Sequence, residues 1–220
     1  AKFPADCKAH KIESLGSAGG FSGAHFWQVI APRGTLCLRR WPKPHPTTTR
    51  LEFIHGLLQH VEKQGFRKVP VPIQDQALPG ASYIQHSGYL WELAPWLPGS
   101  ANYADFPSVE RLQEAMQALA QFHLAATSFS GPANPVGPAP AILERLELID
   151  RWRSGERQRL SLQIDQQDST AAANLHELGK EILVEFDLQA PKIAKELVLS
   201  AEQVVPIQPC IRDIWQQHVL

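Results

Sequence analysis

The sequence predicts an α+β fold with a β-rich first half and a helical second half. Up to Leu93, short apolar runs alternate with turn residues such as Gly19-Gly20, which is typical of antiparallel strands joined by turns. After Pro98-Gly99, apolar residues recur three and four positions apart, which is the spacing of amphipathic helices. The change of pattern indicates two parts, and ligands commonly bind between two such parts.

Strands and one helix are predicted in the first half. The strands are expected at residues 12–15, 26–30, 35–38 and 89–93, where β-favouring residues form short runs. Between the third and fourth strands, residues 47–64 carry apolar side chains at helical spacing. This order favours an antiparallel meander that is interrupted by one helix.

The second half is predicted to be helical. Apolar stripes run along residues 108–126 and along two later segments that begin at Ile142 and Leu175. The proline- and glycine-rich stretch 128–140 is expected to be a loop. The polar, glutamine-rich residues 157–169 fit either a solvated extension of a helix or a loop.

Composition limits the classes of partner. The 220 residues carry 21 basic and 22 acidic side chains, and this formal net charge of −1 argues against a nucleic-acid partner. No apolar run approaches the roughly 20 residues of a membrane helix, so no membrane partner is expected. The three cysteines are far apart and lack CxxC spacing, which argues against a disulfide or zinc framework and favours a cytoplasmic location. Composition leaves the oligomeric state open.

A glycine-rich segment lies between the first two predicted strands. Residues 15–23 read Leu-Gly-Ser-Ala-Gly-Gly-Phe-Ser-Gly. Glycines let backbone N–H groups approach a phosphate without a Cβ clash, and Ser22 adds a hydroxyl. No Gly-Lys-Ser/Thr follows and the next element is a strand, so the segment is neither a Walker A loop nor a Rossmann fingerprint. By itself it fits a phosphate-binding loop and a plain hairpin turn equally well.

Further motifs follow this loop in a fixed order. Leu36-Cys37-Leu38-Arg39 is a predicted strand in which the leucines face one side while Cys37 and Arg39 face the other. Glu52 opens the helix that follows. The later motifs are Trp91-Glu92-Leu93-Ala94-Pro95-Trp96-Leu97-Pro98-Gly99, Leu119-Ala120-Gln121-Phe122-His123 and Arg212-Asp213-Ile214-Trp215-Gln216-Gln217-His218.

In this order the chain resembles the aminoglycoside phosphotransferase and choline kinase-like family, which has a protein-kinase-like fold. The resemblance implies a β-rich nucleotide-binding N-lobe over residues 1–93, a hinge over 94–99 and an incomplete helical C-lobe over 100–220. It implies transfer of the γ-phosphoryl group of ATP to a hydroxyl of a small molecule, with Mg²⁺ or another divalent cation. The residues that would bind the nucleotide are Gly19, Gly20 and Ser22 in the loop, Cys37 against the adenine, Arg39 on the phosphates, Glu52 beside Arg39, and Leu93, Ala94 and Trp96 in the hinge.

Arg39 departs from the family, which uses lysine at this position. Arginine keeps the positive charge, but its planar guanidinium is not a neutral replacement. An arginine exposed at the strand end beside Arg40 is the alternative. Glu52 also fits a capping box with Thr49, because the two lie three residues apart at the predicted helix start. Pairing with Arg39 and capping compete for one carboxylate.

The segment from Arg212 onward resembles the catalytic loop of the family. Asp213 matches the aspartate that contacts the acceptor hydroxyl, and His218 stands at the asparagine position that binds metal. Imidazole suits softer divalent ions better than Mg²⁺, and Ile211 replaces the expected histidine. The family's second metal-binding aspartate would lie beyond Leu220, so we expect this truncated chain to transfer phosphate poorly.

Other interpretations stay open at this stage. Ile211, His218 and Arg39 favour a catalytically weak or inactive kinase-like module that binds a nucleotide or a partner. A structural α+β protein with a glycine turn would bind no nucleotide. His123, on an apolar helix stripe, fits a core residue that supports the catalytic loop better than a catalytic base.

Overall fold

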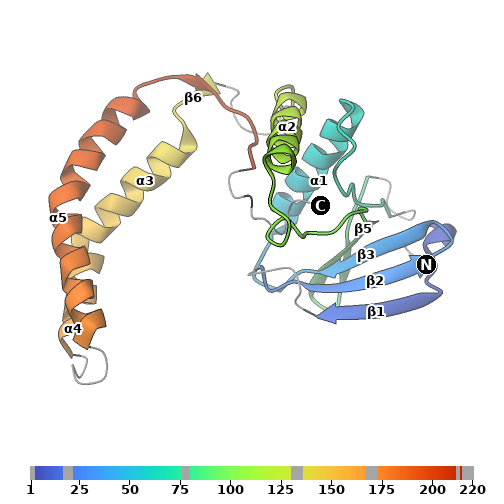
Figure 1. Cartoon of the computed structure of the whole chain (residues 1–220), viewed down its shortest axis with the longest axis horizontal. Coiled ribbons are helices and arrows are strands. Elements are labelled where there is room, and N and C mark those ends of the chain that lie inside the picture. The colour runs from blue at the N-terminus through green and yellow to red at the C-terminus, as the bar shows by residue number, and fades with distance from the viewer. Residues whose placement is uncertain are drawn as a thin grey trace. The chain divides into compact units, whose positions relative to one another are not determined.

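The computed structural model describes residues 3–16, 22–75, 80–129, 136–166, 173–211 and 214 (Figure 1). The chain forms two compact units. The first unit contains Ala1–Gly131 together with Gln208–Leu220, and the second contains Pro132–Ile207.

The first unit is built on a five-stranded antiparallel sheet with the order β1-β2-β3-β5-β4. Strands that follow one another along the chain therefore pair directly, except where α1 separates β3 from the last two strands. The predicted strands and the two predicted helices of this unit are confirmed. The elements are η1 (Ala5–Cys7), β1 (Lys11–Gly16), β2 (His25–Ala31), β3 (Gly34–Arg40), α1 (Thr48–Lys63), β4 (Ile84–His86), β5 (Tyr89–Pro95) and α2 (Val109–Ala126).

One face of the sheet carries the apolar core of the unit. Leu36 and Leu38 point to this face, as the alternation along β3 predicts, and Leu93 joins them from β5. The N-terminal turn η1 covers part of the cluster with Cys7. Cys37 and Arg39, which alternate with the leucines along β3, point to the opposite face of the sheet.

Arg40 continues the core face at the end of β3. Its guanidinium carbon lies 4.7 Å from the ring centroid of Tyr89 and 5.7 Å from that of Trp91. Trp91 in turn stacks on Trp27, with ring centroids 5.4 Å apart. Aromatic side chains from β2 and β5 thus extend the core beyond the aliphatic residues and bury part of a cation over their π faces.

Helices α1 and α2 pack against each other through a second apolar cluster. Leu57 and Val61 of α1 meet Phe122 and Ala126 of α2. The two positions lie four residues apart on each helix, so helical spacing places them on one side. The cluster fixes α2 to the first unit.

The apolar stripe predicted along α2 is only partly buried. Val109, Leu112 and Met116, toward the helix start, are exposed by 65%, 45% and 49%. Phe122, one position before the predicted stripe residue His123, is buried instead. Helix α2 contacts α1 through its last turns only, so the apolar residues near its start stay exposed.

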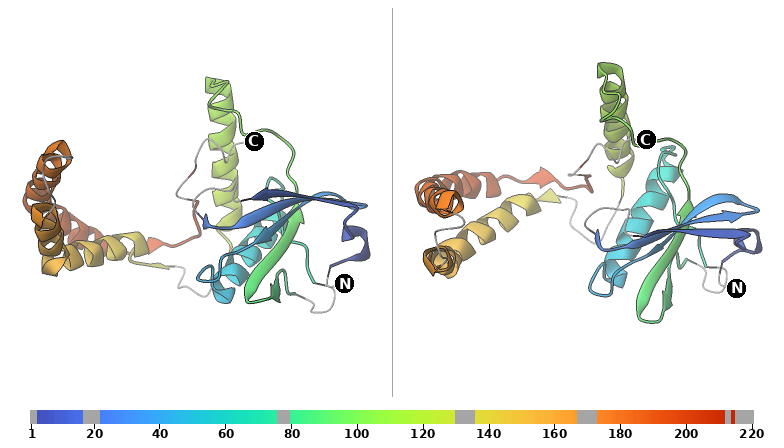
Figure 2. Two further views of the ribbon diagram at one scale, coloured as in Figure 1. Left: turned by 90° about the horizontal axis from the view of Figure 1, so that it is seen from below. Right: turned by 60° about the horizontal axis from the view of Figure 1, so that its bottom comes forward.

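The second unit is a helical hairpin, seen from two sides in Figure 2. α3 and α4 pack along α5, and Trp152 meets Phe186 with ring centroids 6.4 Å apart. The bidentate ion pair from Arg157 to Asp187 links α4 to α5, with its shorter contact at 2.6 Å. The elements are β6 (Val136–Gly137), α3 (Pro140–Arg151), the π-helical turn η3 (Trp152–Glu156), α4 (Arg157–Gln166), α5 (Ala173–Ala201) and β7 (Val205–Pro206).

The helical interpretation of residues 157–169 holds as far as Gln166, beyond which the residues are not described. The predicted lobes stay a prediction. Compactness groups α2 with the sheet because α2 packs on α1, so the compact units divide the chain at other residues than the predicted hinge. Within the described ranges, no helix combines the length and the apolar character that crossing a membrane requires.

Candidate functional site

A buried ion pair lies on the sheet face opposite the apolar core. Arg39 and Glu92 are register partners on β3 and β5, and partners in an antiparallel pair point to the same face. The Arg39 Nη1 atom lies 3.0 Å from Glu92 Oε1. The Glu92 side chain is only 8% exposed and that of Arg39 30%, so the pair is largely shielded from solvent.

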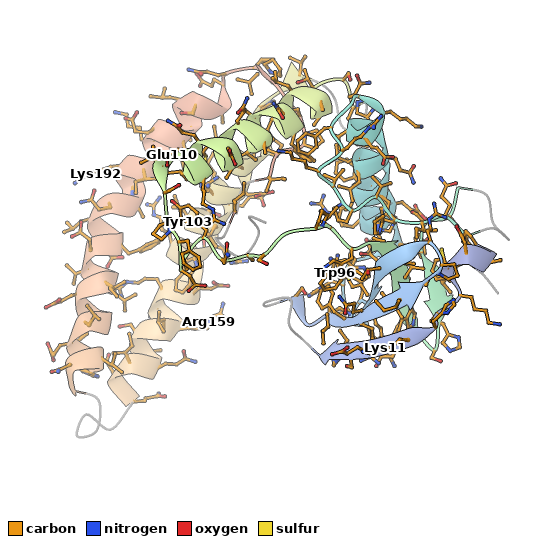
Figure 3. The ribbon with its side chains drawn as sticks, turned by 45° about the vertical axis from the view of Figure 1, so that its right-hand side comes forward. Lys11, Trp96, Tyr103, Glu110, Arg159 and Lys192 are labelled. Carbon is orange, nitrogen blue, oxygen red and sulfur yellow. The ribbon has the colours of Figure 1, made fainter. Side chains whose placement is uncertain are left out.

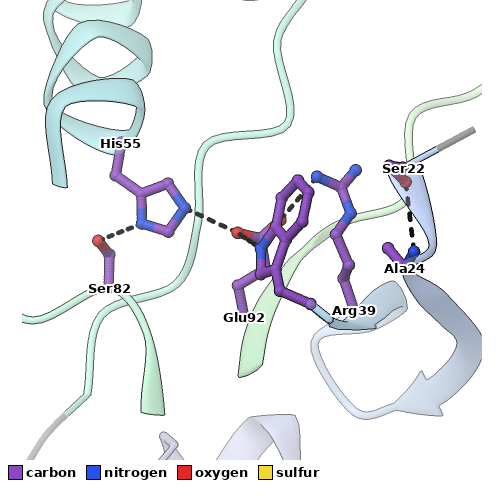
Figure 4. A network of polar contacts seen from close by, with 7 residues as sticks. Ser22, Ala24, Arg39, His55, Ser82 and Glu92 are labelled. Carbon is purple, nitrogen blue, oxygen red and sulfur yellow. Dashed lines mark hydrogen bonds and ion pairs between the residues drawn. The ribbon is translucent and has the colours of Figure 1, made fainter. Parts of the chain in front are cut away.

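The second oxygen of Glu92 is held by two further donors (Figure 4). His55 Nε2 lies 2.8 Å from Oε2, and Trp41 Nε1 donates to the same atom at 3.0 Å. A carboxylate only accepts, so Nε2 of the imidazole carries a proton, and Nδ1 lies 2.6 Å from the Ser82 hydroxyl oxygen. Residues from α1, β3 and the segment after β3 therefore meet at one carboxylate of β5, and Ser82 contacts the far side of His55.

The surroundings of Glu92 keep it ionised. Burial alone raises the pKa of this carboxyl, but the hydrogen bond from His55 and the charge of Arg39 outweigh it, so the pKa lies below its usual value. A charged Glu92 then holds the guanidinium of Arg39 through an ion pair, and the buried surroundings screen this attraction only weakly.

Arg39 also lies against two aromatic rings. Its guanidinium carbon is 4.9 Å from the ring centroid of Phe26 and 4.7 Å from that of Trp41. Its Nε atom is buried without a hydrogen-bond partner among the described residues. The expectation of a merely exposed arginine at a strand end is wrong, because the head group is paired, stacked and has one donor left over.

The predicted partner of Arg39 is wrong. Glu52 does not pair with Arg39: it is exposed and accepts a hydrogen bond from the Tyr83 hydroxyl at 2.8 Å. The alternative capping box is wrong as well, since Thr47 is the N-cap of α1 and accepts from the backbone N–H of Arg50 at 3.2 Å. One turn after Glu52, His55 is the residue of α1 that reaches the pair.

The glycine-rich segment ends beside Arg39. It joins the end of β1 to the start of β2, and Phe26 at the start of β2 is the register partner of Arg39. Gly19 and Gly20 lie outside the described residues. Ser22 is described, and its hydroxyl accepts from the backbone N–H of Ala24 at 3.3 Å, which leaves its own hydrogen free to donate (Figure 4).

The residues predicted to lie near the adenine separate into two groups. Cys37 and Ala94 are register partners on the same sheet face as Arg39, and burial raises the pKa of the Cys37 thiol, which keeps it neutral. Leu93, predicted as a hinge residue whose backbone binds the base, has its side chain in the core on the other face, and its carbonyl accepts from Ile73 N–H at 2.7 Å. Trp96 follows β5 and is 39% exposed (Figure 3).

The predicted catalytic loop is described only at its edge. Asp213 and His218 lie outside the described residues. Ile211, two positions before Asp213, donates its backbone N–H to His123 Nε2 at 3.0 Å. The imidazole of His123 is thus an acceptor that fixes the approach to the loop, in line with the supporting role predicted for it. Within the described ranges, no cluster of at least three metal-ligating side chains occurs.

Four residues of this network have no place in the sequence-based site: Glu92, His55, Ser82 and Trp41. Only Glu92 carries a signal, because it is the one charged residue within the apolar strand sequence Tyr-Leu-Trp-Glu-Leu-Ala-Pro. To recognise Glu92 as the partner of Arg39, one must know how β3 and β5 pair in the sheet, and the sequence alone does not give this register.

The comparison with protein families decides the relationship of the chain. The family described as APH, phosphotransferase enzyme family, matches residues 17–218. The chain belongs to this phosphotransferase family. The antiparallel sheet with its inserted helix and the following helical part is the protein-kinase-like, two-part α+β fold predicted from the sequence.

Solved structures similar to this member of the phosphotransferase family are distant from it. An aminoglycoside phosphotransferase from Alicyclobacillus acidocaldarius has 19% identity and a TM-score of 0.49, with 90% of this chain and 51% of that chain covered. The amicoumacin kinase hAmiN, in complex with AMP-PNP, Ca²⁺ and Ami, has 11% identity and a TM-score of 0.49, with 74% and 47% covered. The spectinomycin phosphotransferase APH(9)-Ia, in complex with ADP and spectinomycin, has 10% identity and a TM-score of 0.42, with 73% and 55% covered.

The chain therefore spans about half the length of these solved phosphotransferases. No curated protein matches it.

Proposed function

We propose that this phosphotransferase uses ATP and transfers its γ-phosphoryl group to a hydroxyl of a small molecule. The observation that carries the proposal is Arg39, a partly buried cation near the end of the glycine-rich segment whose guanidinium is held by Glu92 at one edge. The part of the guanidinium that stays exposed offers N–H donors in a fixed planar arrangement, which matches the oxygens of a phosphate. The residues present thus fit an anionic ligand.

The nucleotide would lie along the Arg39 face of the sheet. Gly19, Gly20 and the Ser22 hydroxyl are proposed to donate to its phosphates, as Arg39 does. The adenine is proposed to pack on Cys37 and Ala94, which offer an apolar surface because the thiol is neutral and Ala94 carries only a methyl group. Trp96, beyond the strand end, is proposed to border the base.

Asp213 is proposed to receive the proton of the acceptor hydroxyl. In the step, the bond between the γ-phosphorus and the β,γ-bridging oxygen breaks, the acceptor oxygen bonds to phosphorus, and the hydroxyl proton passes to the carboxylate. A divalent cation, bound when the nucleotide is bound, supplies charge neutralisation, with His218 as its proposed ligand. The acceptor is a small molecule, with neither a nucleic acid nor a membrane as partner, and the location is proposed to be the cytoplasm.

Nucleotide binding is tested by calorimetric titration of the chain with ATP and Mg²⁺ or Mn²⁺. Binding to the folded state also raises the melting temperature by mass action. We expect saturable heat and an upward shift with ATP. The absence of both in a folded sample would reject nucleotide binding.

A non-catalytic nucleotide-binding module is the second candidate. Ile211, in the position of the family histidine, favours it, because the aspartate then lacks that neighbour. The release of ADP with a panel of hydroxylated acceptors separates the two functions. An enzyme shows acceptor-dependent ADP release that Asp213→Asn abolishes while ATP still binds, whereas a binding module shows ATP binding and the same low turnover in both forms.

A further inference from the structure

A carboxylate of the sheet, and not one of helix α1, holds Arg39, the residue proposed to bind the phosphates. The Arg39–Glu92 contact joins two neighbouring strands whose residues are register partners. Directly opposed residues have Cβ atoms about 4.5–5.5 Å apart, so the backbone of the sheet itself sets the separation of the two side chains. The position of α1 is not needed to form this pair.

Helix α1 nevertheless contributes to the pair, through a different residue type. His55 Nε2 donates to Glu92 Oε2, and the ring is 2% exposed. Its other nitrogen is occupied by Ser82, which is itself buried. The imidazole is therefore fixed at both nitrogens and holds Glu92 in one orientation.

The two oxygens of Glu92 serve different partners. Oε1 contacts Arg39, while Oε2 accepts from His55 and Trp41. This division fixes the direction of the carboxylate, so the guanidinium is held from one edge. Arg39 keeps the exposed part of its head group for a ligand.

We propose that Glu92, oriented by His55, is the positioning residue that sets Arg39 for the nucleotide phosphates, and that Glu52 does not take this part. The proposal rests on the proposed function, since it assigns a role toward the bound nucleotide. Glu52 serves as the internal comparison, because it lies on α1 and accepts a hydrogen bond from the Tyr83 hydroxyl and not from Arg39.

The experiment compares the dissociation constants of ATP and of adenosine, each measured by calorimetry at one temperature below the melting transition. Glu92→Gln keeps the size of the side chain and removes its charge. We expect this variant to weaken ATP binding by about tenfold or more and to change adenosine binding by less than about twofold, because only the phosphates use Arg39. His55→Gln is expected to weaken ATP binding in the same selective way but less.

Two comparisons show whether the loss of ATP affinity in Glu92→Gln comes from the lost positioning of Arg39. Glu52→Gln is expected to change the ATP constant less than Glu92→Gln does, and Glu62→Gln, an exposed acid on the same helix, is the matched control for lost charge. In an Arg39→Ala background, Glu92→Gln is expected to add no further loss for ATP, because the two residues then act through one interaction.

Three results would overturn the inference while the proposed function stands: a larger loss from Glu52→Gln than from Glu92→Gln, equal losses for ATP and adenosine, or an unchanged ATP constant in Glu92→Gln. Should Glu92→Gln not fold, His55→Gln is judged by the same ATP-to-adenosine criterion. A wild-type chain that is folded and binds no ATP rejects the proposed function itself, and the inference with it.

Discussion

His123 Nε2 accepts a hydrogen bond from the backbone N–H of Ile211 at 3.0 Å, across 88 positions of the sequence. The contact joins α2 to the segment that leads to Asp213. A neutral imidazole has one acceptor nitrogen, and here it is used on the backbone. This contact agrees with the supporting role predicted for His123.

Removal of this acceptor should loosen the segment at Ile211. In His123→Ala the amide of Ile211 loses its partner, and we expect its hydrogen exchange to become about tenfold faster or more, which corresponds to about 1.4 kcal/mol of lost protection. Amide exchange followed by NMR measures this. His60→Ala, which removes another side-chain contact to Ser128 at 3.0 Å, is the control and should leave Ile211 unchanged. Unaltered exchange in His123→Ala would show that the contact does not restrain the segment.

Glu92 should make the stability of the protein sensitive to acid. Burial raises its pKa, but His55 and Arg39 lower it more, so the folded state favours the ionised form. A group whose folded pKa is depressed stabilises the fold above its unfolded pKa, about 4.3, and this contribution is lost as pH falls through the folded value. Urea unfolding should therefore show wild type more stable than Glu92→Gln at pH 7, by about 3 kcal/mol for a broken buried pair.

The difference between these two proteins should shrink as the pH falls below about 4.3. A difference that stays constant down to the acid transition would show that the charge of Glu92 does not stabilise the fold.

Two glycines should respond in opposite ways to alanine. Gly56 lies inside α1 with an ordinary backbone, and an added Cβ would meet Phe129 ring atoms at 3.7 and 3.8 Å. Gly56→Ala should therefore stabilise by about 0.5–1 kcal/mol. Gly23 has a φ of +68°, which disfavours a side chain, so Gly23→Ala should destabilise by about 1 kcal/mol. Urea midpoints measure both, and shifts in the same direction would contradict the two backbone arguments.

Apolar residues of α1 and α2 should differ sharply in their contribution to the free energy of unfolding. Leu51 of α1 is fully buried, whereas Met116 of α2 is 49% exposed. Leu51→Ala should cost about 2–5 kcal/mol through lost burial and a cavity, and Met116→Ala about 0.5 kcal/mol or less. Equal losses in urea unfolding would mean that Met116 is buried in solution.

The fold was predictable because its signals are local. The strands carry runs of β-favouring residues, and α1 carries apolar residues at helical spacing, so both follow from short windows of sequence. β4 has three residues, Ile84–His86, which is too short to show an alternation. The stripe of α2 was predicted as a pattern, but which part of it is buried depends on the contact with α1.

The site was predictable only where a motif carries it. Arg39 follows from its place on the third predicted strand, and Cys37 from the alternation along it. Glu52 was assigned by its place at the helix start, but the helix starts at Thr48 with Thr47 as its cap, and His55 is the residue that reaches the sheet. Glu92 needed the pairing of β3 with β5, which is a long-range property.

The stack of Trp27 on Trp91 makes two strands optically recognisable. The rings are 5.4 Å apart and inclined by 28°, close enough for their excited states to couple. Such a pair absorbs and rotates light as one chromophore, so its circular dichroism signal reports on the junction of β2 with β5 across β3. Trp152 lies far along the chain, in the helical unit, and stacks on no second indole among the described residues. During unfolding, the loss of this coupled signal would therefore follow the opening of the sheet separately from the melting of the helical hairpin.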